Sequence, residues 1–384
     1  MLALDGGGVL GVIEIAFLER IEAALRGKLR NPDLVLADYF DLIGGTSTGA
    51  IIATGLALGM TAGQIKRLYF DLADEIFQKP LFSIPGIGPR FDARILTNKL
   101  RGILGERQLQ TTDLKTGLAI VAKRVDTGSP WVITNNPLAK FWEEGPVKPE
   151  TNTAEFIGNK RYLLRHLVRA STAAPYYYSP ARMRIVESED PGLFVDGGVS
   201  PHNNPALQLL MLASINGYGF NWSVSPDDLL LISIGCGWMR PRIDATNPWA
   251  TWTAPMAIKT LQSVIWDSQV NALKILQWIS EPRRPWPINS EVGTLEKEFL
   301  GISFGGDRQE LLKFQRYDVM FEDFEVLEKD TGVRLTKDGL KRFRDFMNPG
   351  IMTEVYELAV RSAATQVDAA DFPDVFDGVS AKAA

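Results

Sequence analysis

A serine set between two glycines is the clearest sign of chemistry in this 384-residue chain. Residues 45–49 read GTSTG, between an apolar run of strand length and an apolar run of helical character. In that context a GxSxG pattern predicts a sharp strand-to-helix turn that holds the serine hydroxyl clear of the sheet. The N-terminus of the following helix favours developing negative charge beside the serine. Ser47 is therefore the candidate nucleophile.

Three consecutive glycines, Gly6, Gly7 and Gly8, follow a short strand-like run at the start of the chain. Acyl transfer requires backbone N–H groups aimed at the oxyanion of a tetrahedral intermediate, and a turn without β-carbons can supply them. Gly6, Gly8 and Gly11 also spell GxGxxG, the dinucleotide-binding fingerprint, which expects an acidic residue about 20 positions later at the end of the next strand. The next strand ends in IGGTSTG instead. Taken alone, this motif leaves both interpretations open.

A carboxylate is the second candidate catalytic group. Asp196 ends the strand-like run LFVD, where open α/β sheets place their sites, although Asp-Gly also commonly caps a turn. The chain has two histidines: His166 falls in a helical pattern and His202 in a turn rich in proline and asparagine. Since histidine is the usual base for a serine nucleophile, these positions favour a Ser47–Asp196 pair without histidine.

Composition excludes several classes of protein. Hydrophobic residues make up 45% and charged residues 23%, which is typical of a globular chain. A net charge of −5 without a basic run argues against binding a nucleic acid polymer. The lone Cys236 excludes a disulfide within the chain and fits a reducing compartment. We see no secretory leader, membrane span or metal-ligand cluster. We expect a cytoplasmic protein without metal or cofactor, with peripheral association with a membrane surface left open.

Strand-like and helix-like runs alternate along the first 240 residues, which predicts an α/β fold with a mostly parallel sheet covered on both faces. We expect one elaborated domain. Its parts are a catalytic core (1–240), a helical elaboration with a final strand (241–367) and an acidic tail (368–384). Six of the nine tryptophans lie in 238–286. That segment and the apolar loop 79–88 are candidates for an acyl pocket or a membrane-facing rim, or simply for packing on the sheet.

The combined motifs resemble a known family. DGGGVLG, GTSTG and DGG followed by NNP, in this order, are similar to the patatin-like phospholipases of bacterial type, and so is the segment ASTAAPYYYSP. The resemblance implies a three-layer α/β/α fold and metal-independent hydrolysis of acyl esters. It further implies that Ser47 is the nucleophile, Asp196 its partner and Gly6, Gly7 and Gly8 the oxyanion hole. The accompanying motif glycines are Gly11, Gly45, Gly49, Gly197 and Gly198.

One position departs from the family pattern. Leu10 stands where the family usually has arginine or lysine, so a cation beside the oxyanion is absent there or supplied elsewhere. Arg90, in the segment GPRFD, is one candidate substitute.

The expected function is that of a lipid acyl hydrolase of the phospholipase A or lysophospholipase type, acting on lipid at a membrane surface. A broad-specificity esterase or acyltransferase and a nucleotide-activated bacterial defence phospholipase are alternative enzymes. A lipid-binding regulatory module with a vestigial site is the alternative from another class. The sequence leaves the headgroup, the acyl position, the oligomeric state and the need for a nucleotide activator open.

Overall fold

The computed structural model describes residues 1–76, 89–150, 152–242, 253–280, 282–287 and 310–378. Two predictions made from the sequence fall outside these residues. They concern the apolar loop 79–88 and the tryptophans at 249 and 252.

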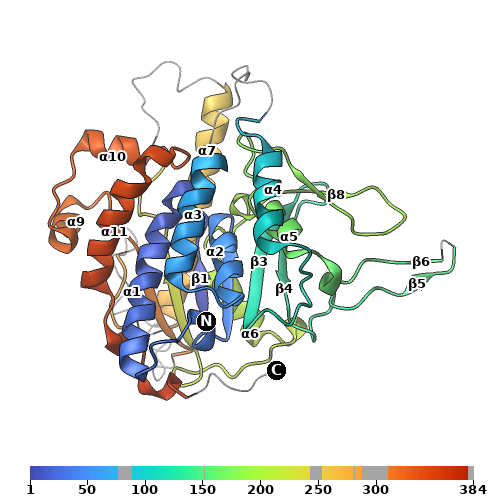
Figure 1. The fold of residues 1–384 in the computed structure, drawn as a ribbon, viewed down its shortest axis with the longest axis horizontal. Coiled ribbons are helices and arrows are strands. Elements are labelled where there is room, and N and C mark those ends of the chain that lie inside the picture. Colours follow the sequence, from blue (N-terminus) through green and yellow to red (C-terminus); the bar gives the residue numbers. More distant parts are fainter. Residues whose placement is uncertain (77–88, 151, 243–252, 281, 288–309, 379–384) are drawn as a thin grey trace.

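A central sheet lies between two layers of helices (Figure 1). Its strands follow the order β10-β9-β1-β2-β3-β8-β7, and β4 also pairs with β3. The strands are β1 (Leu2–Leu4), β2 (Leu42–Thr46), β3 (Gly117–Arg124), β4 (Ser129–Thr134), β7 (Ala181–Met183), β8 (Gly192–Asp196), β9 (Leu230–Ile234) and β10 (Lys313–Tyr317). Pairing is parallel from β10 through β3 and antiparallel where β3 meets β4 and β8 and where β8 meets β7. The predicted three-layer α/β fold is confirmed, with a mixed sheet. The turns after β1 and β2 lie at its parallel part, and the Gly197–Gly198 turn follows the antiparallel β8.

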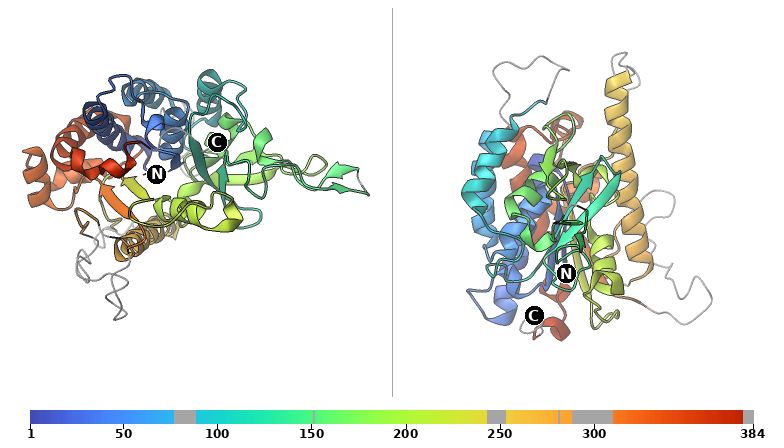
Figure 2. Two further views of the ribbon diagram at one scale, coloured as in Figure 1. Left: turned by 90° about the horizontal axis from the view of Figure 1, so that it is seen from below. Right: turned by 90° about the vertical axis from the view of Figure 1, so that its right-hand side faces the viewer.

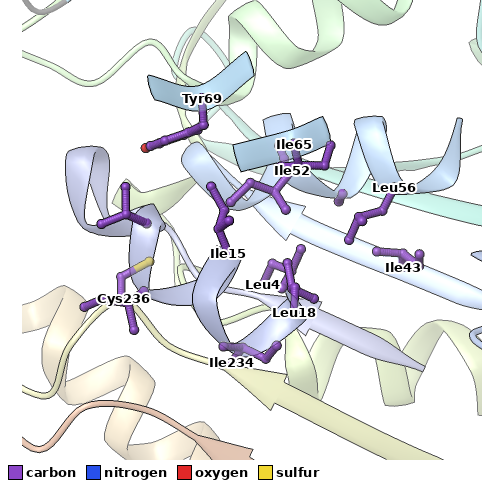
Figure 3. Packing of buried hydrophobic residues seen from close by; sticks show 14 of the residues in the cluster. Leu4, Ile15, Leu18, Ile43, Ile52, Leu56, Ile65, Tyr69, Ile234 and Cys236 are labelled. Carbon is purple, nitrogen blue, oxygen red and sulfur yellow. The ribbon is translucent and has the colours of Figure 1, made fainter. Parts of the chain in front are cut away.

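The central strands have apolar residues on both faces because helices cover both. On one face, Leu4, Ile43 and Ile234 pack against Ile15 and Ile52 (Figure 3). The helices of this layer are α1 (Gly11–Leu29), α2 (Thr48–Ala57), α3 (Ala62–Ile76), α4 (Ala93–Leu104), α5 (Leu164–Ser171) and α11 (Met352–Gln366). Cys236, just after β9, is buried at the edge of the same cluster.

The opposite face of the sheet carries the alternate residues of the same strands. Ala3, Leu42 and Leu231 pack there against α6 (Ala206–Ser214) and α7 (Thr253–Trp278), which lie on the far side of the sheet from α1 (Figure 2). α7 thus belongs to the part of the chain expected to be a helical elaboration. This alternation explains why the strands read as nearly continuous apolar runs.

The register of the strands brings the carboxyl ends of β2 and β8 together in the middle of the sheet. Thr46, the last residue of β2, pairs with Val121 of β3 in parallel, and Asp196, the last residue of β8, pairs with Ala122 in the antiparallel sense. β4 occupies the other edge of β3 along both residues. β2 and β8 therefore run toward each other along one edge of β3, and their carboxyl ends meet.

The C-terminal part of the chain completes this body. β10 extends the sheet beside β9, and α11 packs along α1 (Figure 1). The connecting helices are α9 (Phe324–Thr331) and α10 (Lys337–Phe343). The start of the expected acidic tail is also packed: Phe372 is buried, and the buried Asp371 accepts a hydrogen bond of 2.7 Å from the Tyr317 hydroxyl.

A two-stranded hairpin of β5 (Val147–Lys148) and β6 (Thr153–Ala154) extends away from the body (Figure 2). Among the helices of the described ranges, none combines the length and the apolar character needed to cross a bilayer.

Candidate active site

Ser47 occupies a strained turn between β2 and α2. Its backbone angles, φ 54° and ψ −119°, lie in a region that costs on the order of 1–3 kcal/mol for a residue with a side chain. The flanking glycines make the turn sterically feasible. A β-carbon on Gly45 would lie 2.1 Å from the carbonyl oxygen of Gly49, and one on Gly49 would lie 2.4 Å from that of Leu4. The predicted elbow geometry is present, with the serine at its apex.

The hydroxyl at this apex faces a buried carboxylate. Ser47 Oγ donates a hydrogen bond of 2.6 Å to Asp196 Oδ2, and the backbone N–H of Gly198 donates one of 2.7 Å to the other oxygen, Oδ1. Burial raises the pKa of Asp196 to about 6, against the lowering effect of these two hydrogen bonds and of Arg169. Such a carboxylate is a better proton acceptor than a free aspartate, while still ionised for the most part at neutral pH.

Neither histidine takes part in this arrangement. His166 lies on α5 and His202 in the turn after β8, where its carbonyl accepts a hydrogen bond of 2.6 Å from Thr46 Oγ1. Burial lowers the pKa of both imidazoles. Ser47 Oγ is hydrogen-bonded to Asp196 instead, as a pair without histidine requires.

The glycine loop lies against the same serine. A β-carbon on Gly6 would lie 3.2 Å from the β-carbon of Ser47, which shows how closely the loop approaches. The Gly6 N–H donates to the Asn203 carbonyl at 3.0 Å. This differs from the expectation of three oxyanion donors. Among the described residues, the N–H groups of Gly7 and Gly8 have no hydrogen-bond partner, so these two remain available.

Several contacts fix the orientation of this loop. Gly8 has a φ of +58°, which favours glycine, and its carbonyl accepts hydrogen bonds from Thr48 Oγ1 at 2.9 Å and from the Tyr69 hydroxyl. The N–H of Val9 donates to the Phe346 carbonyl at 2.8 Å. The loop is thus held from the nucleophile's own helix and from the C-terminal part of the chain.

A second serine connects the elbow to the sheet. Ser171 Oγ, at the end of α5, donates to the Val121 carbonyl at 2.5 Å and accepts a hydrogen bond of 2.9 Å from the Ser47 N–H. Val121 of β3 pairs with the last residue of β2, and its neighbour Ala122 pairs with the last residue of β8. The Ser171 hydroxyl therefore provides hydrogen-bond partners for two backbone groups at the point where β2 leads into the turn at Ser47.

Comparison with known proteins identifies the family. The family model for patatin-like phospholipase matches residues 2–210, more than half of the chain. The chain belongs to the patatin-like phospholipase family.

Two relatives illustrate the match. A cGAMP-activated phospholipase of Escherichia coli (strain TW11681) is 29% identical over 240 residues, covering 61% of this chain and 61% of the relative. Patatin group M-1 of Solanum tuberosum is 31% identical over 253 residues, covering 62% of this chain and 60% of the relative. The chain thus spans about 61% of the length of such relatives. The crystal structure of VipD from Legionella pneumophila is 12% identical, with a TM-score of 0.33, 93% coverage of this chain and 66% of that one, a likeness too weak to establish a common fold.

A cavity of about 320 Å³ opens onto the patatin-like site. It is lined by Ser47, Asp196 and the glycine loop on one side and by residues of α7 on the other. Its volume lies at the lower end of the range for sites that bury small ligands. Of the tryptophans predicted for an acyl pocket or a packing role, Trp238 and Trp266 line the cavity. Their rings contact each other at a tilt of 53°, with 4.3 Å between the centroids.

The family's usual arginine or lysine is absent at position 10, where this chain has leucine. Leu10 is buried and lines the cavity. Arg90, the candidate substitute, lies over the rings of Phe91 and Tyr177 and is not among the described lining residues. Arg316 on β10 does line it, and its guanidinium holds the Asp5 carboxylate at 2.7 Å, directly before the glycine loop.

Sequence reasoning missed the groups that position the patatin-like site. Asn203 makes two hydrogen bonds with Gly6. Its backbone carbonyl accepts from the Gly6 N–H, and its side-chain amide donates to the Gly6 carbonyl at 3.1 Å. Asn203 and Ser171 belong to the quoted segments NNP and ASTAAP, so a signal for them existed. No sequence signal pointed to Arg316 and Phe346, because they lie more than 300 residues along the chain from the loop that they contact.

Proposed function

We propose that this protein is a serine lipid acyl hydrolase that cleaves carboxylic esters of phospholipids or lysophospholipids through Ser47 and Asp196. The observation that carries the proposal is the 2.6 Å hydrogen bond from Ser47 Oγ to a buried carboxylate in a cavity lined by the glycine loop. Membership of the patatin-like phospholipase family supports the lipid substrate class. No metal is needed for the steps below.

In the first step, Asp196 accepts the proton of Ser47 as Oγ attacks the ester carbonyl. The free N–H groups of Gly7 and Gly8 receive the oxyanion of the tetrahedral intermediate. Removing one such donor from an oxyanion hole typically costs about 2.7–4 kcal/mol of transition-state stabilisation. Collapse of the intermediate passes the proton from Asp196 to the leaving alcohol and leaves an acyl group on Ser47.

In the second step, the same carboxylate accepts a proton from water as the water attacks the acyl-enzyme. The second tetrahedral intermediate releases the fatty acid and returns the proton to Ser47. The raised pKa of Asp196 serves both steps, because a general base transfers protons most effectively when its pKa lies near the working pH.

The proposal is tested by incubating the protein with defined phospholipids and lysophospholipids and analysing the products by mass spectrometry. A fluorophosphonate probe, analysed by peptide mapping, is expected to label Ser47. Fatty acid release together with this label supports the proposal. Hydrolysis of short soluble esters alone would indicate a general esterase, and transfer of the acyl group to an added alcohol would indicate an acyltransferase. Lipid binding without release or labelling would indicate a binding module.

A nucleotide activator is a separate proposal, which rests on the name of one relative, a cGAMP-activated phospholipase. The same lipid assay with and without added cGAMP tests it. A rate that rises with the nucleotide supports an activator, and equal rates across a wide concentration range reject this one.

A further inference from the structure

The inner wall of the cavity beside Ser47 carries one guanidinium group bonded to two carboxylates. Arg316 donates to Asp5 Oδ2 at 2.7 Å and to Asp318 Oδ2 at 2.9 Å, and all three side chains are buried. Asp318 also accepts hydrogen bonds from the N–H groups of Gly237 and Val319. The Arg316 guanidinium is thus paired with protein carboxylates.

The outer wall has an excess of positive charge. Arg240 and Arg344 line the cavity, and both contact Glu322, Arg240 through Nε at 3.3 Å. Arg242 shares the same carboxylate at 3.4 Å. Arg344 also donates to the Arg240 carbonyl at 2.6 Å, which fixes its guanidinium in place. One carboxylate therefore serves three guanidinium groups at this wall.

A fourth cation faces the cavity from another element. Lys259 belongs to α7, lines the same cavity and is half-buried. Within the described residues no carboxylate lies within ion-pair distance of its ammonium group, and burial together with the nearby Arg344 lowers its pKa. A partly desolvated ammonium that has no carboxylate partner among the described residues favours the binding of an anion.

The same helix gives the cavity an apolar side. Ile258, Leu261 and Ile265 of α7 line it together with Trp266. An occupant would therefore meet hydrocarbon contacts along α7 and an excess of positive charge at the outer wall, in one volume of about 320 Å³ that Ser47 also lines. That combination matches an amphiphile with an acyl chain and a phosphate group.

We propose that Lys259, Arg344 and Arg240 form a subsite for the phosphodiester of a lipid whose acyl ester lies at Ser47. The subsite rests on the proposed function, because it places the phosphate of the same substrate molecule. A free phosphate group shares the recognised chemistry, and the lipid is favoured because the apolar wall adjoins the cations. Lys259 is the most informative position, since it makes no ion pair within the described residues that a substitution would break.

The test compares two substrates with the same acyl chain in mixed micelles, a lysophospholipid and a monoacylglycerol without phosphate. Lys259→Gln is expected to lower the ratio of kcat/KM for the lysophospholipid over the monoacylglycerol about tenfold, the effect of one charge-assisted contact. Lys259→Arg should restore most of the ratio. Lys274→Gln, on the same helix but not among the described lining residues, is the matched control and should leave the ratio at its wild-type value.

A binding arm separates failure of the subsite from failure of the proposed function. The Ser47→Ala variant with a fluorescent lysophospholipid reports binding without turnover, and adding Lys259→Gln should weaken that binding about tenfold. If the wild-type protein hydrolyses neither lipid but this loss is seen, the proposed function fails and the subsite stands. An unchanged ratio and unchanged binding in Lys259→Gln overturn the subsite. Lys259-dependent binding of inorganic phosphate, together with lysophospholipid binding that does not depend on Lys259, would overturn the assignment to lipid.

Discussion

At the scale of single residues, the environment makes an aspartate suitable for work that a histidine usually does. A free aspartate has a pKa near 3.9 and accepts a serine proton poorly at neutral pH. Burial brings the pKa of Asp196 to about 6, and the Gly198 N–H keeps one oxygen occupied so that the other faces Ser47. The carboxylate is thus both oriented and more basic than it would be in water.

Replacing this carboxylate tests its role directly. Asp196→Asn keeps the size and the hydrogen-bonding shape of the side chain but removes the base, so kcat for ester hydrolysis should fall about 10²- to 10⁴-fold. Circular dichroism and the melting temperature check that the fold is kept. Asp190→Asn, at an exposed position before the same strand, is the control and should retain wild-type activity. An Asp196→Asn enzyme with more than half of the wild-type rate would exclude the proposed dyad.

The pKa of Asp196 also predicts the pH dependence. The base must be deprotonated, and its folded-state pKa is raised, so kcat/KM should rise with pH through an apparent pKa of about 6. The measurement is kcat/KM for a neutral soluble ester between pH 4 and 8, so that the substrate does not titrate. A plateau that already begins at the pKa of a free aspartate, about 3.9, would show that burial does not tune this group.

At the scale of elements, the site forms because two strands converge on a third. β2 and β8 end at adjacent residues of β3, which places Ser47 and Asp196 within hydrogen-bonding distance although they are far apart in sequence. Ser171 braces this junction from α5 by bonding both the Val121 carbonyl and the Ser47 N–H. The strained Ser47 backbone depends on such support.

Removing the brace should weaken both folding and catalysis. Ser171→Ala leaves a buried N–H and a buried carbonyl without a partner, which costs about 1–3 kcal/mol in the free energy of unfolding. The same change lets the nucleophile shift, so kcat should fall at least about tenfold. Urea unfolding and steady-state kinetics measure the two effects. Ser214→Ala removes a hydroxyl that bonds only within α6 and should leave kcat unchanged; equal losses of activity in both variants would contradict the brace.

At the scale of the whole molecule, the chain beyond the family match is part of the site. The match ends at residue 210, yet Arg316 of β10 holds Asp5, and Phe346 holds the N–H of Val9. β10 also protects the edge of β9, which would otherwise expose unpaired backbone groups. We propose that residues 1–367 fold as one domain, with the catalytic core and the C-terminal elaboration sharing one sheet.

A substitution of Arg316 tests whether the C-terminal elaboration and the catalytic core fold as one domain. Arg316→Met leaves Asp5 and Asp318 buried without their cation, so the free energy of unfolding should fall by about 3–5 kcal/mol. Arg342→Met, which removes an exposed ion pair with Glu354, should cost less than about 1 kcal/mol. Chemical unfolding of the full chain measures both. Similar small losses for the two variants would show that the C-terminal strand is not coupled to the glycine loop.

The sequence by itself determined the local features of this protein. Alternating apolar runs predicted the layers, GTSTG predicted the elbow at Ser47, and the carboxylate after LFV predicted the base at Asp196. Such features depend on short-range sterics and periodicity, which neighbouring residues specify.

Only the tertiary structure decided which groups meet. It paired the Gly6 N–H with the Asn203 carbonyl, left the N–H groups of Gly7 and Gly8 without a partner among the described residues, and brought Arg316 beside Asp5. It also packed Phe372 of the expected acidic tail into the core. These outcomes depend on strand register and on contacts between segments hundreds of residues apart, for which a single sequence carries no local signal.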